Sequence, residues 1–208
     1  MGDKSLKETE YNNVEYKMLE IKESRIQLKE FNQCTFIKCK FNGTYFQRCH
    51  FRDCTFVGCD LSLVNLKDTS FANTRFAESQ LQGINWTQSD WAAGALLNRP
   101  ATFQNCVLNF SSFMGLNLEK AILNHCIVHE VSFEDTNLSF ADCSGTDFKD
   151  SRFARTNLTG ADFRGAINYH IDPSINTLKK TKFDLPEAMS LLYNMDIILE
   201  ELPAALNR

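Results

Sequence analysis

The chain has 208 residues, of which 43% are hydrophobic, and a formal net charge of −4. This apolar content can form one sizeable buried core and argues against a disordered chain. The acidic balance argues against direct nucleic-acid binding, which requires clustered Lys and Arg to displace counterions from the phosphates. The polar start, MGDKSLKETEYNN, contains no apolar stretch suited to a signal sequence or a membrane anchor, so we expect a cytoplasmic protein without membrane contact.

The dominant pattern in the sequence is a period of five. Large apolar residues occupy every fifth position from Ile21 to Trp91, and a second register runs from Phe103 to Phe163 with only Cys143 small. The residue two positions before each large one is mostly small, commonly Cys, Thr, Ser or Ala. Fourteen of the seventeen phenylalanines lie in these columns, and the others are Phe110, Phe140 and Phe183. Neither a helix nor a simple strand has this period.

Each five-residue unit therefore points two residues inward and three outward. A chain of this kind can turn a corner after each unit, and four corners close a square of twenty residues. Successive coils can then pair at the spacing of β-strands, about 4.8 Å. The pattern predicts an all-β, four-sided parallel β-helix of about seven coils over residues 21–168, with a break near 92–102.

Units such as ANTRF, TNLTG, GADFR and SFADC resemble those of the pentapeptide-repeat proteins over about residues 20–168. The resemblance implies a right-handed quadrilateral β-helix. A stacked array needs a cap at each end. We expect an N-terminal cap in residues 1–20 and a C-terminal cap and dimerisation segment in residues 169–208, and Lys29 at an inward position predicts an irregular first coil.

The break in register lies between Trp91 and Phe103, which are twelve residues apart. Gly94 and Pro100 in this interval indicate a loop that leaves the coil, and breaks in regular scaffolds often carry contacts. A corner insertion without a partner is the alternative. We interpret Trp86 and Trp91 as core residues rather than interface anchors. The candidate contact residues of the loop are Leu96, Leu97, Asn98, Arg99 and Pro100.

The C-terminal segment DLPEAMSLLYNM predicts a short α-helix, with Asp184 as N-cap and Glu187 at the capping-box position. Its apolar residues either close the last coil only or also join two rods end to end as a homodimer. The residues assigned to the dimer interface are Leu185, Leu191, Leu192, Met195, Ile197, Ile198 and Leu202.

Catalytic and metal-binding patterns are not apparent. All eight cysteines fall in the inward columns, and their steps of five, ten or twenty residues differ from the close pairs typical of metal sites. Packing is the better interpretation, and we expect thiols although stacked pairs such as Cys34 and Cys54 could form disulfides. The outward histidines lack a nucleophile motif, so we expect no enzyme, no metal and no cofactor.

Charge is uneven along the predicted rod. Residues 103–165 carry five basic and eight acidic side chains, so this half is net negative. An acidic rod as wide as a DNA duplex could compete with DNA for a basic groove. An ordinary solvated surface is the alternative. The outward acidic residues, expected on three adjoining faces, are Glu130, Glu134, Asp135, Asp142, Asp147, Asp150 and Asp162.

Four segments extend the resemblance to a subgroup that protects bacterial type II topoisomerases, which includes the albicidin-resistance protein, the Qnr proteins and the microcin immunity protein. They are CDLSL (59–63), GINWT (83–87), AINYHID (166–172) and FDLPEA (183–188). The resemblance implies a dimeric DNA mimic that binds DNA gyrase or topoisomerase IV and counters a topoisomerase poison, through the acidic residues, the loop and the tail. The alternatives are a scaffold for another protein partner and, less favoured, an ice-binding solenoid.

Overall fold

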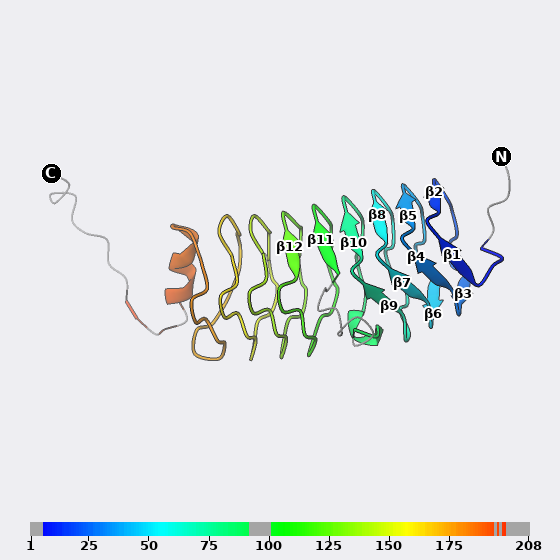
Figure 1. The fold of residues 1–208 in the computed structure, drawn as a ribbon. Coiled ribbons are helices and arrows are strands. Elements are labelled where there is room, and N and C mark those ends of the chain that lie inside the picture. Colours follow the sequence, from blue (N-terminus) through cyan, green and yellow to red (C-terminus); the bar gives the residue numbers. More distant parts are fainter. Residues whose placement is uncertain (1–5, 92–100, 194, 196, 199–208) are drawn as a thin grey trace.

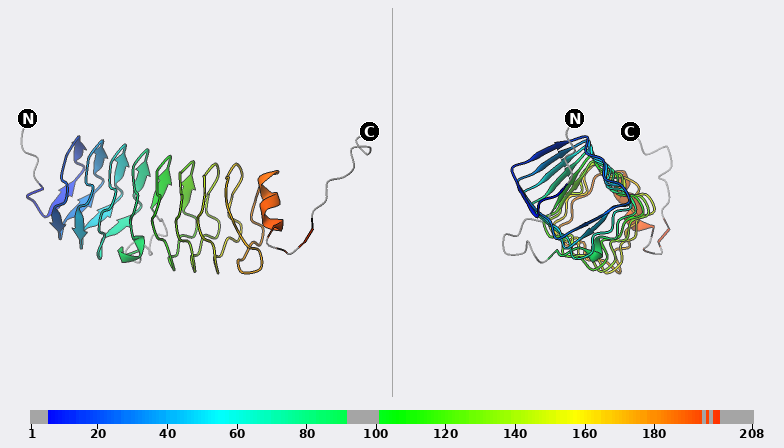
Figure 2. Two further views of the ribbon diagram at one scale, coloured as in Figure 1. Left: turned by 180° about the vertical axis from the view of Figure 1, so that it is seen from behind. Right: turned by 90° about the vertical axis from the view of Figure 1, so that its right-hand side faces the viewer.

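The structure is a computed structural model, and it describes residues 6–91, 101–193, 195 and 197–198. The chain winds into one straight rod of stacked coils, with the N-terminal coil at one end and a helical segment at the other (Figure 1). Viewed along the rod, the backbone traces a square (Figure 2). The predicted right-handed quadrilateral parallel β-helix is confirmed.

Twelve strands of three residues each make up the regular part of the coils. In each strand of the coil body the middle side chain points inward, because successive residues of a strand alternate between its two sides. Their bounds are β1 Glu10–Asn12, β2 Glu15–Lys17, β3 Arg25–Gln27, β4 Glu30–Asn32, β5 Thr35–Ile37, β6 Tyr45–Gln47, β7 His50–Arg52, β8 Thr55–Val57, β9 Ser70–Ala72, β10 Arg75–Ala77, β11 Thr102–Gln104 and β12 Ile122–Asn124.

The rod has four faces, which we name A to D in the order in which the chain reaches them from β2 onward. The first strand, β1, precedes this point and lies on face D. Face A holds the six-stranded sheet of β2, β5, β8, β10, β11 and β12, and face D begins with β1, β4, β7 and β9. Face C begins with the pair β3 and β6, and face B consists of single bridges from Glu20 to Ile167. All these pairings are parallel, as a continuously wound chain requires.

Strands cover six levels of face A, which is about five turns rather than the predicted seven. Isolated bridges extend this ladder from Ile122 through Asp142 and Asp162 to Lys182. The pairing therefore reaches beyond the boundary predicted at residue 168. It also starts before residue 21, because β1 and β2 lie in the segment expected to be a cap.

One coil is longer than the others. Successive coils are offset by twenty residues, as in the pairing of Thr35 with Thr55, whereas Arg75 pairs with Thr102. The offset there is 27 residues, as also between Ile84 and Ser111, so seven residues are added where a break near 92–102 was predicted. The predicted loop residues Leu96, Leu97, Asn98, Arg99 and Pro100 lie outside the described residues.

The two ends of the solenoid are closed by different contacts. At the N-terminal end, Lys29 Nζ donates to the carbonyl of Glu8 at 2.5 Å, which accounts for this charged residue at an inward position. At the C-terminal end, residues Glu187–Leu192 form a 3-10 helix, so the prediction of an α-helix is wrong. No side chain caps that helix, because the carboxylates of Asp184 and Glu187 accept the N–H groups of Gly165 and Asn168 in the last coil instead.

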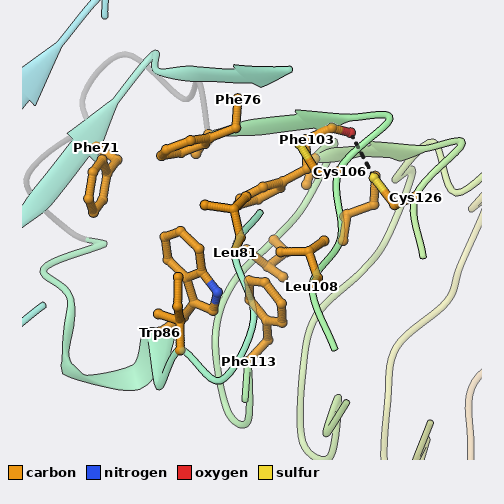
Figure 3. Packing of buried hydrophobic residues seen from close by; sticks show 14 of the residues in the cluster. Phe71, Phe76, Leu81, Trp86, Phe103, Cys106, Leu108, Phe113 and Cys126 are labelled. Atoms are coloured by element: carbon orange, nitrogen blue, oxygen red, sulfur yellow. Dashed lines mark hydrogen bonds between the residues drawn. The ribbon is translucent and has the colours of Figure 1, made fainter. Parts of the chain in front are cut away.

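The core consists of stacked inward side chains (Figure 3). Phe113 lies between Trp86 and Phe133, with ring centroids 5.6 Å and 5.5 Å away and nearly parallel planes. Trp86 is fully buried, as predicted, and the half-buried Trp91 donates from Nε1 to the Trp86 carbonyl at 2.8 Å. Stacking of identical columns thus fills the square interior.

The cysteines are part of this core, as predicted. All eight are buried free thiols, and the Cys126 Sγ donates to the Phe103 carbonyl at 3.5 Å (Figure 3). Burial raises the pKa of Cys54 to about 12 and raises the pKa of Cys143 as well. Cys54 and Cys143 are therefore protonated at neutral pH.

Substitution of Phe113 by Ala tests the stacked core. We expect a loss of about 3–5 kcal/mol in the free energy of unfolding, because a large cavity opens between two rings. Phe110→Ala is the control, since Phe110 is 61% exposed, and it should change stability by less than about 0.5 kcal/mol. Urea denaturation followed by circular dichroism measures both, and equal effects would contradict the stacking argument.

Candidate interaction surface

Each unit exposes three residues, and they differ in backbone conformation. The first two lie on either side of the large inward residue. The third lies at the turn to the next face and has a positive φ, for example 60° at Phe110, 55° at Glu130 and 58° at Asp150. The first of the three is Asn or Asp in many units, and its side chain accepts the N–H two residues on, as Asn137 does from Ser139 at 3.1 Å. These positions form columns along the rod.

The seven acidic residues predicted as a binding surface lie on three adjoining faces of the second half. Asp142 and Asp162 pair on face A, and Asp147 pairs with Ile127 on face B. Glu130 and Asp150 lie at the turn between faces B and C. Glu134 lies on face C, and Asp135 lies at the turn that follows face C.

Two of these carboxylates are neutralised by neighbouring cations. Asp162 accepts from Arg164 Nη2 at 2.6 Å and lies 3.4 Å from Lys182 Nζ, and the Arg164 guanidinium holds its pKa well below the usual range. Asp135 accepts two hydrogen bonds from Arg155, at 2.6 Å and 2.8 Å, which lower its pKa. They contribute little net negative charge to a partner.

Asp142 and Asp147 occupy the turn-forming position of the unit. Asp142 Oδ1 accepts from the N–H of Ser144 at 3.0 Å. Burial alone would raise the pKa of Asp147, but hydrogen bonds from Asn168 and His129, both 2.8 Å, outweigh it and lower the pKa. Since Asn serves the same turns elsewhere, these two carboxylates have a structural role that sequence reasoning missed.

Glu130, Glu134 and Asp150 differ from the other four. Among the described residues, none of their carboxylates has an ion-pair partner within 4 Å or a side-chain hydrogen bond. Glu130 and Asp150 are exposed and occupy the same turn one coil apart. The carboxylates of Glu130 and Asp150 therefore lie together where faces B and C meet, in a hollow that Arg152 also lines and with Lys149 next to Asp150 in the chain.

The C-terminal end presents exposed apolar side chains. Leu185 is 78% and Ile198 89% exposed, whereas Leu191 packs against the core. Sequence reasoning did not name Met189 and Tyr193, which are also exposed. Of the other predicted interface residues, Leu192 is half-buried, Met195 and Ile197 are exposed, and Leu202 lies outside the described residues.

Residues 6–91, 101–193, 195 and 197–198 contain no cluster of three or more His, Cys, Asp or Glu side chains that could hold a metal ion. None of their helices combines the length and the apolar character needed to span a membrane.

Comparison with known proteins identifies the family. A model of the pentapeptide repeat region matches residues 29–113, and a model of eight pentapeptide repeats matches residues 132–167, so together they match more than half of the chain. The chain is a pentapeptide-repeat protein. A search of curated protein sequences finds no match.

Solved structures of QnrB1 show the same fold. A trypsin-treated form of QnrB1, described as a plasmid-mediated fluoroquinolone resistance protein, aligns over 92% of this chain and 99% of its own, with a TM-score of 0.68 and 19% identity. Full-length QnrB1 aligns over 88% of this chain and 100% of its own, with a TM-score of 0.57 and 20% identity. HetL, a pentapeptide-repeat protein from the cyanobacterium Nostoc, aligns over 84% of this chain and 67% of its own at 14% identity with a TM-score of 0.34.

The substitution Asp162→Asn tests whether the paired carboxylates support the fold. Asn keeps the turn acceptor but removes the charge, so we expect a loss of about 1 kcal/mol at pH 7. Because the folded-state pKa of Asp162 lies below its unfolded value of about 3.9, this stabilisation is present above that value and is lost as the pH falls further. Urea denaturation at pH 7 and pH 3 should therefore show a difference that shrinks on acidification.

Asp150→Asn is the matched control, because Asp150 has no ion-pair partner among the described residues. It should leave stability unchanged within about 0.5 kcal/mol at pH 7. A larger loss for Asp150→Asn than for Asp162→Asn would refute the division into paired and unpaired carboxylates.

Proposed function

We propose that this pentapeptide-repeat protein binds DNA gyrase or topoisomerase IV and protects the enzyme from a topoisomerase poison, as drug resistance or self-immunity. The observation that carries the proposal is the row of Glu130 and Asp150 along a straight rod, because these exposed carboxylates have no ion-pair partner within 4 Å among the described residues. The resemblance of residues 59–63, 83–87, 166–172 and 183–188 to the gyrase-protecting subgroup supports it. The likeness to QnrB1 over the length of both chains agrees with this proposal.

Binding would displace or exclude DNA from a basic surface rather than catalyse a reaction. Carboxylates that have no internal partner steer the rod toward a positively charged groove and contribute to the specificity of contact. The role needs neither a cofactor nor direct nucleic-acid binding, and it requires a cytoplasmic protein. An interaction scaffold for a different protein partner is the second candidate, and it is favoured by the internal neutralisation of Asp135 and Asp162.

A supercoiling assay tests this function. Purified protein should restore supercoiling by gyrase, or decatenation by topoisomerase IV, in the presence of a poison. The triple variant Glu130→Gln, Glu134→Gln and Asp150→Asn should require at least about tenfold more protein, because three unpaired charges are lost, and the difference should narrow at high salt. The absence of protection by the wild type against several classes of poison would refute the proposal.

We also propose that two rods associate through their C-terminal ends. Leu185 and Ile198 expose apolar surface there, and closing one coil does not require them. The double variant Leu185→Glu and Ile198→Glu should be monomeric by light scattering, with an unchanged circular dichroism spectrum. Met18→Glu is the control, because Met18 is 67% exposed in the N-terminal part of the rod, and it should stay dimeric. A monomeric wild type at high micromolar concentration would contradict the dimer.

A further inference from the structure

Two diagonally opposite edges of the rod differ in chemistry in its second half. The turn between faces B and C carries Phe110, Glu130 and Asp150 on three successive coils, and we name these residues the BC edge. The turn between faces D and A carries Lys120, Phe140, Gly160 and Lys180, and we name these the DA edge. Each edge has one exposed phenylalanine. The charged residues of the BC edge are carboxylates, and those of the DA edge are lysines, of which Lys120 forms an ion pair with Glu119 at 3.0 Å.

Backbone hydrogen bonds hold the BC edge in register. The N–H of Phe110 donates to the carbonyl of His129, and the N–H of Glu130 donates to that of Lys149, both at 3.0 Å. Corresponding residues of successive coils therefore lie about 4.8 Å apart along the rod. The BC edge is a straight row consisting of one aromatic ring and two carboxylates.

The fold itself does not require these side chains. Glycine occupies the same turn between faces B and C at Gly83, with φ of 66°. Two carboxylates about 5 Å apart also repel each other by about 0.8 kcal/mol even in water. Phe110, Glu130 and Asp150 therefore contribute little to stability, which leaves these side chains free for a contact outside the chain.

The two exposed phenylalanines also differ in their surroundings. Phe140 lies over Gly160 on the next coil, where an added Cβ would come within 2.7 Å of its ring, and Leu63 lies over Gly83 in the same way. Phe110 is followed one coil on by Glu130, so it has no glycine to cover. Phe110 is 61% exposed, and its ring stacks on no other aromatic ring of the described residues.

Two other exposed apolar side chains lie on the adjoining faces. Met114, 45% exposed, lies at the far end of face C, and Ile127, 43% exposed, lies near the start of face B on the next coil. Ser112 and His129 lie between these residues and the turn. Interfaces commonly combine an aromatic anchor with a charged rim. The BC edge has that composition, with Phe110 as the aromatic side chain and Glu130 and Asp150 as the charged part.

We infer that the rod meets its partner with the BC edge, and that Phe110 is the apolar anchor of the contact. The partner presents a concave basic protein surface. An apolar pocket on that surface takes the Phe110 ring, and cationic side chains beside the pocket, at the spacing of one coil, pair with Glu130 and Asp150. The inference rests on the proposed function, since it specifies which part of the rod enters the topoisomerase. The DA edge presents Lys180 and the ion pair of Lys120 with Glu119, so it offers the same surface no unpaired carboxylate.

A pair of matched alanine substitutions tests the anchor. Phe110→Ala and Phe140→Ala each remove one exposed ring at a turn with positive φ. Binding to immobilised purified gyrase and topoisomerase IV is measured by biolayer interferometry, after urea denaturation has shown both variants to be folded. We expect Phe110→Ala to weaken binding at least tenfold and Phe140→Ala to change it by less than twofold.

Charge reversal provides the second pair. Glu130→Lys with Asp150→Lys should lower the association rate at least tenfold at low salt, whereas Lys120→Glu with Lys180→Glu should leave it unchanged or raise it. If the wild type binds and the two alanine variants behave alike, or only Phe140→Ala weakens binding, the inference is overturned and the proposed function stays in place. A wild type that binds neither enzyme overturns both.

Discussion

The backbone hydrogen bonds between coils determine the rest of this structure. The backbone N–H and C=O groups of each coil form hydrogen bonds with those of the next coil at a constant offset in sequence. A residue therefore pairs with the one twenty positions later, except across the lengthened coil. Since parallel pairing allows no slip without turning inward side chains outward, each column must repeat the same kind of residue. The rings of Phe31 and Phe51, 4.7 Å apart and almost parallel, follow from this constraint. The outward columns inherit the same spacing, which is why chemistry on the surface is arranged in rows.

The same constraint explains why the acidic surface is smaller than the sequence suggested. The first outward position of a unit needs a side chain that accepts the N–H two residues on, and both Asn157 and Asp147 do this. An Asp at that position is therefore explained by the turn. Cations recur at the same offset, since Arg155 lies one coil after Asp135 and Lys182 one coil after Asp162. Charge counted along the sequence thus overestimates the charge available to a partner.

The fold was predictable from the sequence because its signal is repeated in every coil. The columns that contain Phe103 and Cys126 appear as a period of five, and a large inward residue beside a small one leaves few other folds. The ion pairs at an offset of twenty could also have been read from the sequence once the coil length was known.

The ends and the lengthened coil were less predictable, because they do not repeat. Asp184 and Glu187 match a helix cap in sequence, yet their carboxylates reach the N–H groups of Gly165 and Asn168, which the last coil leaves without a following strand. Across the break between Trp91 and Phe103, the column of large residues is displaced by two positions. Two added residues and seven added residues give the same displacement in a period of five, so the pattern alone does not distinguish them.

The position of the break limits how a partner can approach the rod. The described chain lies on face D at Trp91 and resumes on face A by Thr102, so the break falls between these two faces, diagonally opposite the BC edge. A flat partner surface cannot touch both edges of a square rod at once. The net charge of residues 103–165 is −3 over about three coils, or one charge per about 5 Å, compared with one per about 1.7 Å in duplex DNA. Charge at that density needs additional contact area, which a concave surface that encloses several faces can provide.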